Sequence, residues 1–297
     1  SNEEAFDVVP YAKALNSYIM ERVYTYKLPR KIKVAMAINK EDDPHVTVTD
    51  LGFLAVEKDG EKFFKLYLGG GLGRNPRLSV EYDELIKPED CIYYFEAMVR
   101  LFIAEGDYKN HNKARIRYIV ERMGEEEFVK CYKKYVNEVL NEADLRIDVK
   151  ENKVNKQGIV TEFKDARLIP QKQEGLYSVY FHPYGGKLEL SLLNDILNAV
   201  KDMDDIEFRF TLKEGFYIIN LNGKEAEKMI ELTKGRGGEI RVTQSVSCIG
   251  VPICQMGIAN SQGLLISILD KLSKENVEKF YKNTRKNKFY GLMYFIR

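Results

Sequence analysis

The sequence has few of the features that define several large classes of protein. Only four cysteines occur among 297 residues, too few for a disulfide scaffold, so a reducing compartment is expected. No uncharged apolar run approaches the roughly 20 residues that a membrane-spanning helix needs. Residues 1–20 lack a basic segment followed by an apolar run, so no secretory signal peptide is expected. The sequence therefore predicts a soluble, cytoplasmic protein with no membrane partner.

An excess of one charge sign is also absent. Lysine and arginine number 46 and the acidic residues 45, which gives a net charge of +1. This balance excludes the general basic excess of a non-specific nucleic-acid binder, and no nucleic-acid partner is expected. A local basic pocket is still compatible with the composition.

Several common catalytic motifs are missing. There is no GxSxG elbow for a nucleophilic serine, and the histidines at 45, 111 and 182 show no metal-binding spacing. The glycine run Gly69–Gly73 lacks the Lys-Ser/Thr pair of a phosphate-binding P-loop. Such a run can instead bring backbone amides close to a large polyanionic ligand.

What the sequence does contain is the patterning of an α+β protein. Residues 1–145 read as an α/β module in which apolar periodicity alternates between helix and strand spacing. Helices are expected at residues 6–24, 88–106, 112–123 and 125–140, and strands at 28–36, 45–56 and 62–68, with a turn at Asp59-Gly60.

The second half shows three segments of different character. Residues 146–175 are highly charged with little periodicity, which predicts an extended linker. Residues 176–235 follow the order β-α-β-β-α of half a ferredoxin-like domain, with Leu188, Leu192, Ile196 and Val200 expected on the buried helix face. Residues 236–297 begin a further unit.

Two groups of basic residues are candidates for binding an anion. Lys31 and Lys33 are two apart in the expected strand, so both ammonium groups project from one face, where they could bind a small oxyanion and deliver protons. Lys113, Arg115 and Arg117 form a basic patch on an expected helix. For both groups, an ordinary solvated surface is the alternative.

The four cysteines divide into two kinds. Cys248 and Cys254 lie six apart in a loop that contains glycine and proline and opens a helix, which suits two thiolates turned toward one iron–sulfur or zinc centre. Two ordinary buried cysteines are the alternative for this pair. Cys91 and Cys131 lie in expected helices and are interpreted as core residues.

Taken together, these segments resemble the siroheme- and [4Fe–4S]-dependent nitrite and sulfite reductases. The resemblance runs through nearly the whole chain in the family's order. It is carried by Phe6–Ala12, Leu28–Lys33, Thr49–Phe53, Gly69–Gly73, Lys113–Arg115 with Tyr118, Gly124 and Phe128, Gly186–Thr211 and Cys248-x5-Cys254.

The resemblance implies a function and roles for particular residues. The activity would be the six-electron reduction of sulfite to sulfide or nitrite to ammonia, with electrons from a ferredoxin or flavoprotein. Lys31 and Lys33 match lysines that face the bound anion, and Cys248 and Cys254 match the first two of four cluster ligands. Lys113, Arg115 and Arg117, with Gly70 and Gly71, fall where the family binds siroheme.

The chain also departs from the family pattern. It lacks the downstream Cys-x3-Cys pair and the N-terminal half-ferredoxin unit, so it resembles an internal fragment in which the cluster is expected to be incomplete. Tyr108 and His111 stand where many relatives have arginine. Two alternatives therefore stay open. One is a catalytically silent relative, and the other is an oxyanion- or tetrapyrrole-binding module without redox chemistry.

Overall fold

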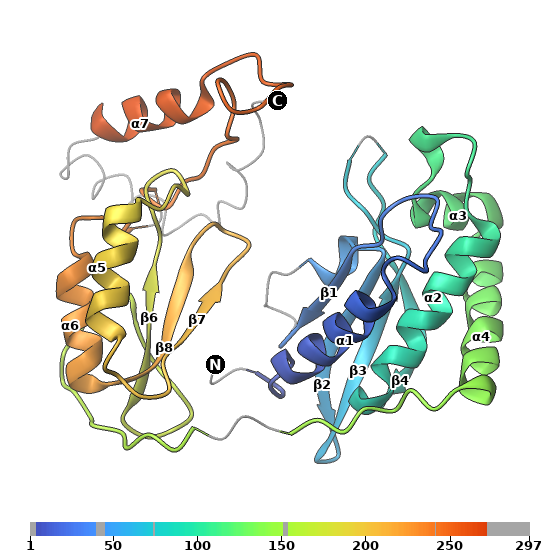
Figure 1. Cartoon of the computed structure of the whole chain (residues 1–297), viewed down its shortest axis with the longest axis horizontal. Coiled ribbons are helices and arrows are strands. Elements are labelled where there is room, and N and C mark those ends of the chain that lie inside the picture. The colour runs from blue at the N-terminus through green and yellow to red at the C-terminus, as the bar shows by residue number, and fades with distance from the viewer. Residues whose placement is uncertain (1–3, 40–44, 74, 151–153, 241, 272–297) are drawn as a thin grey trace, which may run out of the picture. The chain divides into compact units, whose positions relative to one another are not determined.

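The computed structural model describes residues 4–39, 45–73, 75–150, 154–240 and 242–271. Within these ranges the chain divides into two units, residues 4–150 and 154–271, which are called the first and second unit. Each unit combines helices with one four-stranded sheet (Figure 1). The α+β class predicted from the sequence is confirmed. No helix of the described residues is long and apolar enough to cross a membrane.

The sheet of the first unit has the strand order β1-β2-β3-β4. Its strands are β1 (Val34–Ala37), β2 (Leu51–Lys58), β3 (Glu61–Leu68) and β4 (Val80–Ile86). β1 runs parallel to β2, and the other two pairings are antiparallel. The β2–β3 turn forms at Asp59-Gly60, as predicted, because both residues adopt the positive φ angles that such a two-residue turn requires.

Four helices complete the first unit. They are α1 (Val9–Arg22), α2 (Cys91–Glu105), α3 (Ile116–Met123) and α4 (Glu125–Glu142), with 3₁₀ turns at Val46–Val48, Pro88–Asp90 and His111–Lys113. Side chains of the helices and of β2 and β3 share one large core. Figure 1 shows α1 and α2 in front of this sheet. The opposite face of β2 packs Leu54 against Ala37 and Val46.

Three of the predicted boundaries in the first unit are wrong. The strand expected at 28–36 begins only at Val34, because Pro29 has no N–H to donate and the Lys33 N–H is bonded to a side chain, that of Asp50. The strand expected from His45 begins at Leu51, after a 3₁₀ turn. The helix expected from residue 112 begins at Ile116. Strand β4 was not predicted.

The second unit has the strand order β5-β6-β8-β7. Its elements are β5 (Leu168–Pro170), β6 (Leu176–Phe181), α5 (Leu190–Val200), β7 (Glu207–Phe210), β8 (Phe216–Asn222), α6 (Gly223–Thr233) and α7 (Ser261–Lys271). Elements β6 to α6 follow the predicted β-α-β-β-α order. The segment interpreted as a linker contributes β5 to this sheet, paired with β6.

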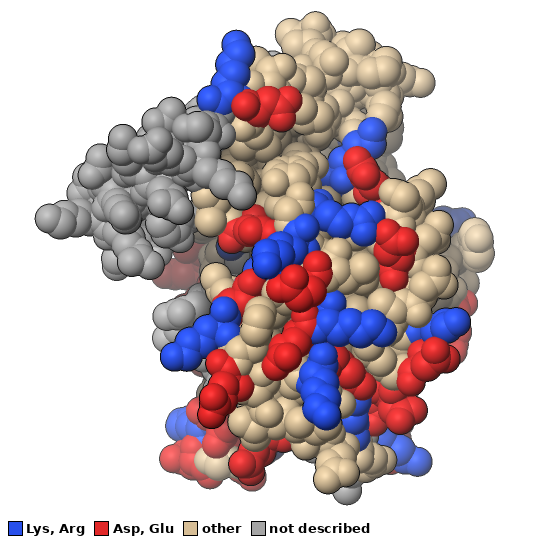
Figure 2. Space-filling view, turned by 90° about the vertical axis from the view of Figure 1, so that its left-hand side faces the viewer, with Lys and Arg blue, Asp and Glu red and all other residues tan. Residues whose placement is uncertain are grey.

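Helices α5 and α6 cover one face of the second sheet (Figure 1). Leu192, Ile196 and Val200 are buried there as predicted, and Leu188 is partly buried against the same core. The outer face of these helices carries basic and acidic side chains intermixed, with no large patch of one sign in that view (Figure 2).

Candidate functional site

The lysine segment lies immediately before β1. Lys31 and Lys33 are exposed, whereas Ile32 between them is partly buried against the core of the first unit. The Lys33 carbonyl accepts a hydrogen bond of 3.2 Å from the Leu51 N–H, so the parallel pairing with β2 extends one residue beyond the strand. This extended backbone directs both lysine side chains away from the core, although neither lies in a strand.

The glycine run follows β3 and turns back along the residues that precede β2. The Gly69 N–H donates to the Asp50 carbonyl at 2.8 Å, and the Gly70 N–H donates to the Thr49 carbonyl at 2.9 Å. Gly71 pairs with Arg77 through two backbone hydrogen bonds of 2.9 and 3.0 Å. Gly69, Gly70 and Gly71 are all buried. A β-carbon at Gly70 would collide with Ser79, so only glycine fits there.

The three basic residues at 113, 115 and 117 do not share one helix face. Lys113 is exposed in the 3₁₀ turn, Arg115 precedes α3 as its N-cap residue, and Arg117 lies in the first turn of α3. Arg117 is only 7% exposed, so it differs from the solvated arginine that the surface interpretation predicts. Lys113 instead borders a separate cavity of about 330 Å³, together with Asp107 and Tyr118.

Arg117 lies directly over the glycine run. A β-carbon built on Gly71 would be 3.1 Å from the Arg117 Nη1 atom, closer than side chains normally approach. The guanidinium also stacks at 4.7 Å on the ring of Tyr118, a cation–π contact. Its Nε atom is buried and has no hydrogen-bond partner among the described residues. Arg117 therefore lies beside the glycine backbone with its Nε–H not hydrogen-bonded to any described residue.

Arg115 forms an ion pair with Asp50, a residue to which the sequence interpretation gave no role. Asp50 is fully buried, and its Oδ2 atom accepts hydrogen bonds from Arg115 Nη2 and, at 2.8 Å, from the Lys33 N–H. Burial raises the pKa of the Asp50 carboxyl above its ordinary value, although Arg115, the Lys33 amide and Arg117 oppose the shift. The feature of the sequence that could have indicated a role for Asp50 is its position directly before the apolar run of β2.

The structure therefore brings most of the predicted first-unit residues together around Asp50. Lys33 and Arg115 share its carboxylate, Gly69 and Gly70 bond to the backbone of Thr49 and Asp50, and Arg117 covers Gly71. Two further buried atoms, Asp50 Oδ1 and Arg115 Nε, have no partner in the described part of the chain. This arrangement places Arg117 over Gly71, with Arg115, two residues earlier in the sequence, paired with Asp50.

Tyr108 and His111 occupy positions at which the resemblance implies arginine in many relatives. Both are exposed. The Tyr108 hydroxyl donates to the Lys27 carbonyl at 2.7 Å and also lies 3.2 Å from the Ile103 carbonyl. It therefore ties the end of α2 to the chain just before the lysine segment.

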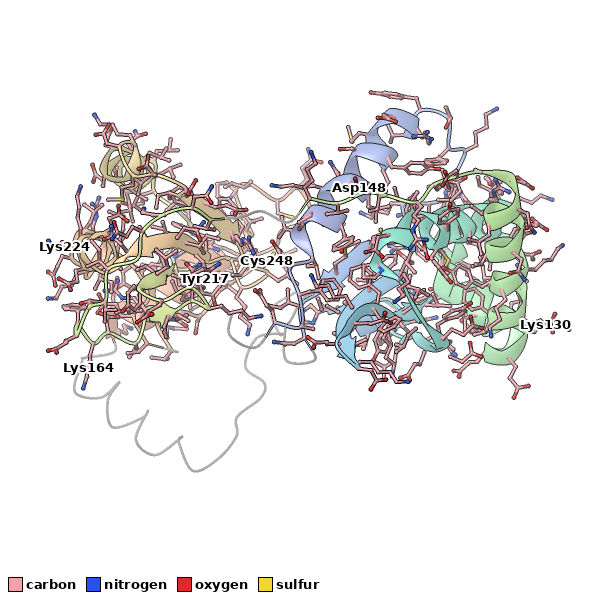
Figure 3. All side chains as sticks on the ribbon, turned by 90° about the horizontal axis from the view of Figure 1, so that it is seen from below. Lys130, Asp148, Lys164, Tyr217, Lys224 and Cys248 are labelled. Atoms are coloured by element: carbon pink, nitrogen blue, oxygen red, sulfur yellow. The ribbon has the colours of Figure 1, made fainter. Side chains whose placement is uncertain are left out.

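Cys248 and Cys254 lie in the second unit, in the loop before α7; Figure 3 labels Cys248. Both thiols are free, with Cys248 exposed and Cys254 partly buried. The Cys254 N–H donates to the Gly250 carbonyl at 2.8 Å, and Ser261 Oγ donates to the Cys248 carbonyl at 2.6 Å. No cluster of three or more His, Cys, Asp or Glu side chains suited to a metal occurs within the described ranges.

The other two cysteines have different surroundings. Cys91 is buried, and burial raises the pKa of its thiol to about 12. Cys131 is partly buried, and burial raises its pKa as well. Both stay protonated at neutral pH and pack against the core of the first unit, which agrees with the structural interpretation of these residues.

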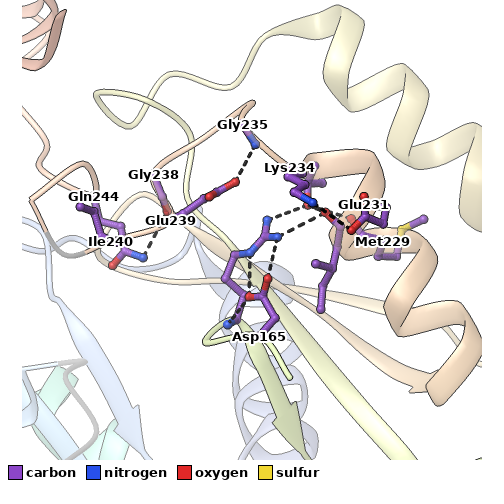
Figure 4. Close-up of polar contacts among 12 residues, drawn as sticks. Asp165, Met229, Glu231, Lys234, Gly235, Gly238, Glu239, Ile240 and Gln244 are labelled. Carbon is purple, nitrogen blue, oxygen red and sulfur yellow. Dashed lines mark hydrogen bonds and ion pairs between the residues drawn. The ribbon is translucent and has the colours of Figure 1, made fainter. Parts of the chain in front are cut away.

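The sequence interpretation also did not predict a buried polar network in the second unit. Arg167, 5% exposed, donates to both carboxylate oxygens of Asp165, to Thr233 Oγ1 at 3.0 Å and to the Ile230 carbonyl at 3.3 Å (Figure 4). These contacts attach the chain before β5 to the end of α6. They satisfy acceptors at a helix C-terminus.

Comparison with known proteins points to one family. The model of the family described as "Nitrite and sulphite reductase 4Fe-4S domain" matches residues 1–140, which contain the whole Asp50-centred site. Over these residues the chain is similar to the nitrite and sulfite reductases.

The relatives of this chain agree with that match. The chain is 25% identical over 272 residues to the sulfite reductase [NADPH] hemoprotein beta-component of Shewanella woodyi, covering 85% of this chain and 44% of the relative. The corresponding protein of Shewanella oneidensis is also 25% identical, with 46% of its length covered. The chain thus spans less than half the length of these relatives.

A solved structure shares the fold. The Mycobacterium tuberculosis NirA protein superimposes with a TM-score of 0.72 over 99% of this chain and 52% of that chain. The sequence identity is 18%, so this likeness concerns the fold alone. The α+β architecture of this chain therefore agrees with a known structure.

Proposed function

We propose that this chain supplies part of a siroheme- and [4Fe–4S]-dependent reductase, which reduces sulfite to sulfide or nitrite to ammonia with six electrons. Residues 1–145 would form the first siroheme-binding module, and residues 236–297 would begin the second. The observation that carries this proposal is the meeting of the lysine segment, the glycine run and two arginines at Asp50. The match of residues 1–140 to the family model supports it.

The basic residues fit siroheme, which carries eight carboxylates. The Nε donors of Arg115 and Arg117 are buried and have no partner among the residues that the structure describes, a costly state that a carboxylate oxygen would relieve. Gly70 and Gly71 leave the neighbouring surface free of side chains. Lys113 would add a third charge from the exposed turn. When bound, siroheme would supply electrons to the oxyanion.

Lys31 and Lys33 would hold the oxyanion and its protons. Their exposed side chains belong to a backbone fixed between Ile32 in the core and the first residue of β2. Each ammonium can donate a charge-assisted hydrogen bond worth about 1.5–3 kcal/mol to an anionic oxygen. As negative charge grows on a departing oxygen, a proton held at Nζ moves to it.

The cysteine pair fits a [4Fe–4S] cluster only in part. Cys248 and Cys254 would supply two thiolates, and such a cluster takes four. We therefore expect this chain, purified alone, to contain no complete cluster. Iron and sulfide analysis checks this, and about four of each per chain would contradict it.

The electron donor and the compartment follow from the same proposal. A ferredoxin or a flavoprotein would donate the electrons, because single low-potential electrons are needed six times. The reaction would take place in the cytoplasm, where free thiols such as those of Cys248 and Cys254 persist.

Siroheme titration of the purified chain tests the proposal. We expect an absorbance change that saturates with siroheme, and a dissociation constant at least ten-fold higher in Arg117→Met, whose side chain keeps much of the apolar stem but loses the charge. Lys58→Met, which removes an exposed lysine from β2, serves as the matched control. Absence of binding, or equal binding by both variants, would refute the siroheme role.

The lysine role has its own test in an enzyme that carries both cofactors. Lys33→Met should lower sulfite and nitrite turnover at least ten-fold, about 1.4 kcal/mol, while siroheme stays bound. Unchanged turnover would mean that Lys33 is a solvated surface residue. Siroheme binding without any turnover would favour the catalytically silent relative.

A further inference from the structure

Asp50 touches all three segments of the proposed siroheme and anion site. Its Oδ2 atom accepts the Lys33 N–H at 2.8 Å and contacts Arg115 Nη2. Its backbone carbonyl accepts the Gly69 N–H at 2.8 Å. These partners lie 17, 65 and 19 residues away in the sequence. A single residue therefore connects three segments that are distant from one another in the sequence.

The Asp50 carboxylate accepts the Lys33 N–H, a hydrogen bond that a backbone carbonyl of a neighbouring strand would otherwise accept. In a parallel pair, backbone carbonyls would accept the N–H groups, but here the Lys33 N–H is bonded to a side chain. The reciprocal bond, from the Leu51 N–H to the Lys33 carbonyl, fixes the same peptide from its other side. Both bonds together determine the orientation of the backbone that carries Lys31 and Lys33.

Burying this carboxylate is costly. Asp50 is fully buried, its Oδ1 atom has no partner within the described ranges, and only Arg115 opposes it as an ion-pair partner. Replacing a whole buried ion pair by apolar residues is often neutral or stabilising, whereas removing one partner is destabilising. Stability alone therefore gives little reason for the Asp50–Arg115 pair.

We propose that Asp50 is a positioning residue, which sets the pose of the Lys33 backbone and of the Arg115 guanidinium without touching substrate or cofactor. The inference rests on the proposed function for its purpose, because the groups that Asp50 orients are those assigned to the oxyanion and to siroheme. The statement that Asp50 orients the Lys33 backbone and the Arg115 guanidinium can be tested without siroheme or an oxyanion.

Three substitutions separate positioning from packing. Asp50→Asn keeps an oxygen that accepts from Lys33 and Arg115, whereas Asp50→Leu fills the space and accepts nothing. Asp50→Ala removes both functions. Asp83→Asn is the control, since Asp83 is an exposed carboxylate of the same unit paired with Lys133.

The first measurement is amide hydrogen exchange of the full chain by NMR. We expect the Lys33 amide to exchange at least ten-fold faster in Asp50→Leu and Asp50→Ala, and within about three-fold of wild type in Asp50→Asn and Asp83→Asn. Amides of β3 and α4 should keep their protection in Asp50→Leu. Wild-type protection of Lys33 in Asp50→Leu would overturn the proposal, and so would a loss of protection throughout the first unit in both Asp50→Asn and Asp50→Leu.

The second measurement is siroheme titration of the same proteins. Asp50→Leu leaves Arg115 without its ion-pair partner and should lower the melting temperature, so the titration is made at a temperature at which the variant is still folded. Under that condition Asp50→Leu should raise the siroheme dissociation constant at least ten-fold, and Asp50→Asn should largely restore the affinity. Equal affinity of Asp50→Leu and wild type would refute positioning toward the ligand. If wild type itself binds no siroheme, the proposed function fails, while the exchange data still decide whether Asp50 holds Lys33.

Discussion

Removing the Arg167 guanidinium should destabilise the second unit strongly. Arg167→Met keeps the apolar stem but removes the guanidinium donors to Asp165 and to the Ile230 carbonyl. Asp165 then accepts the backbone N–H of residue 167, and the Ile230 carbonyl accepts from Thr233 Oγ1, but the positive charge beside the carboxylate is lost. Thr233 Oγ1 retains a bond to the Met229 carbonyl, so it adds little to the loss. The network is nearly inaccessible to solvent at the arginine, whose side chain is 5% exposed.

The expected magnitude follows from burial. Breaking a fully buried ion pair by removing one partner costs about 3–5 kcal/mol. The Asp165 side chain is 24% exposed, so water can solvate part of the orphaned carboxylate, and we expect about 2–3 kcal/mol. For a unit of this size, that loss lowers the melting temperature by about 5–10 °C.

Differential scanning calorimetry of the full chain measures this change. Arg236→Met is the matched control, because its ion pair with Asp195 at 2.7 Å is at least a third exposed on both sides. That variant should lose no more than about 1 kcal/mol. Equal melting temperatures for the two variants would refute the buried-network reasoning.

The same variant has a pH signature. Burial raises the pKa of Asp165, but hydrogen bonds from the Arg167 side chain and backbone outweigh burial and hold it below the ordinary value of 3.8. The stabilisation that Asp165 contributes is therefore complete above that value and is lost as the pH falls through the lower, folded-state pKa. The stability difference between wild type and Arg167→Met should shrink as the pH approaches 3, and a constant difference would contradict this.

Three further predictions concern single side chains. Gly71→Val should displace Arg117 and raise the siroheme dissociation constant at least ten-fold; unchanged titration would contradict this. Burial lowers the pKa of His182, so the unfolding free energy should fall as the pH drops below about 6.5. His182→Gln, which can still donate to the Lys213 carbonyl, should flatten that dependence in urea unfolding, and an equally steep profile would exclude the histidine. Asn222→Ala removes the capping box of α6 and should cost about 1 kcal/mol in the same assay, where no change would show the cap to be dispensable.

Elements with a strong period were predictable because their burial follows local spacing. Helix α5 has Leu192, Ile196 and Val200 on one face, and all three are buried as the spacing requires. The β2–β3 turn was equally readable, since Asp59-Gly60 is a pair that favours positive φ angles. In such cases a few neighbouring residues are enough to predict the element.

Boundaries decided by distant contacts were not predictable. Gly52 in β2 packs so closely on the Val46 backbone that a β-carbon would not fit, and the chain before β2 turns into a 3₁₀ segment instead of continuing the strand. Arg167 lies in a stretch interpreted as a linker, because its charge looks solvated until its partners at the end of α6 are known. Tertiary packing decided these cases.

For the candidate site, the sequence by itself determined the chemical groups: two lysines at strand spacing, an arginine pair, a glycine run and two thiols. Only the tertiary structure decided that the lysine segment, the glycine run and both arginines meet, since their common partner Asp50 is 17 residues from Lys33 and 65 from Arg115. It also decided that Arg117 is buried over Gly71 while Lys113 stays in solvent. The physical reason is that a buried carboxylate acquires its role from the donors that folding brings to it, and local sequence does not record which donors those are.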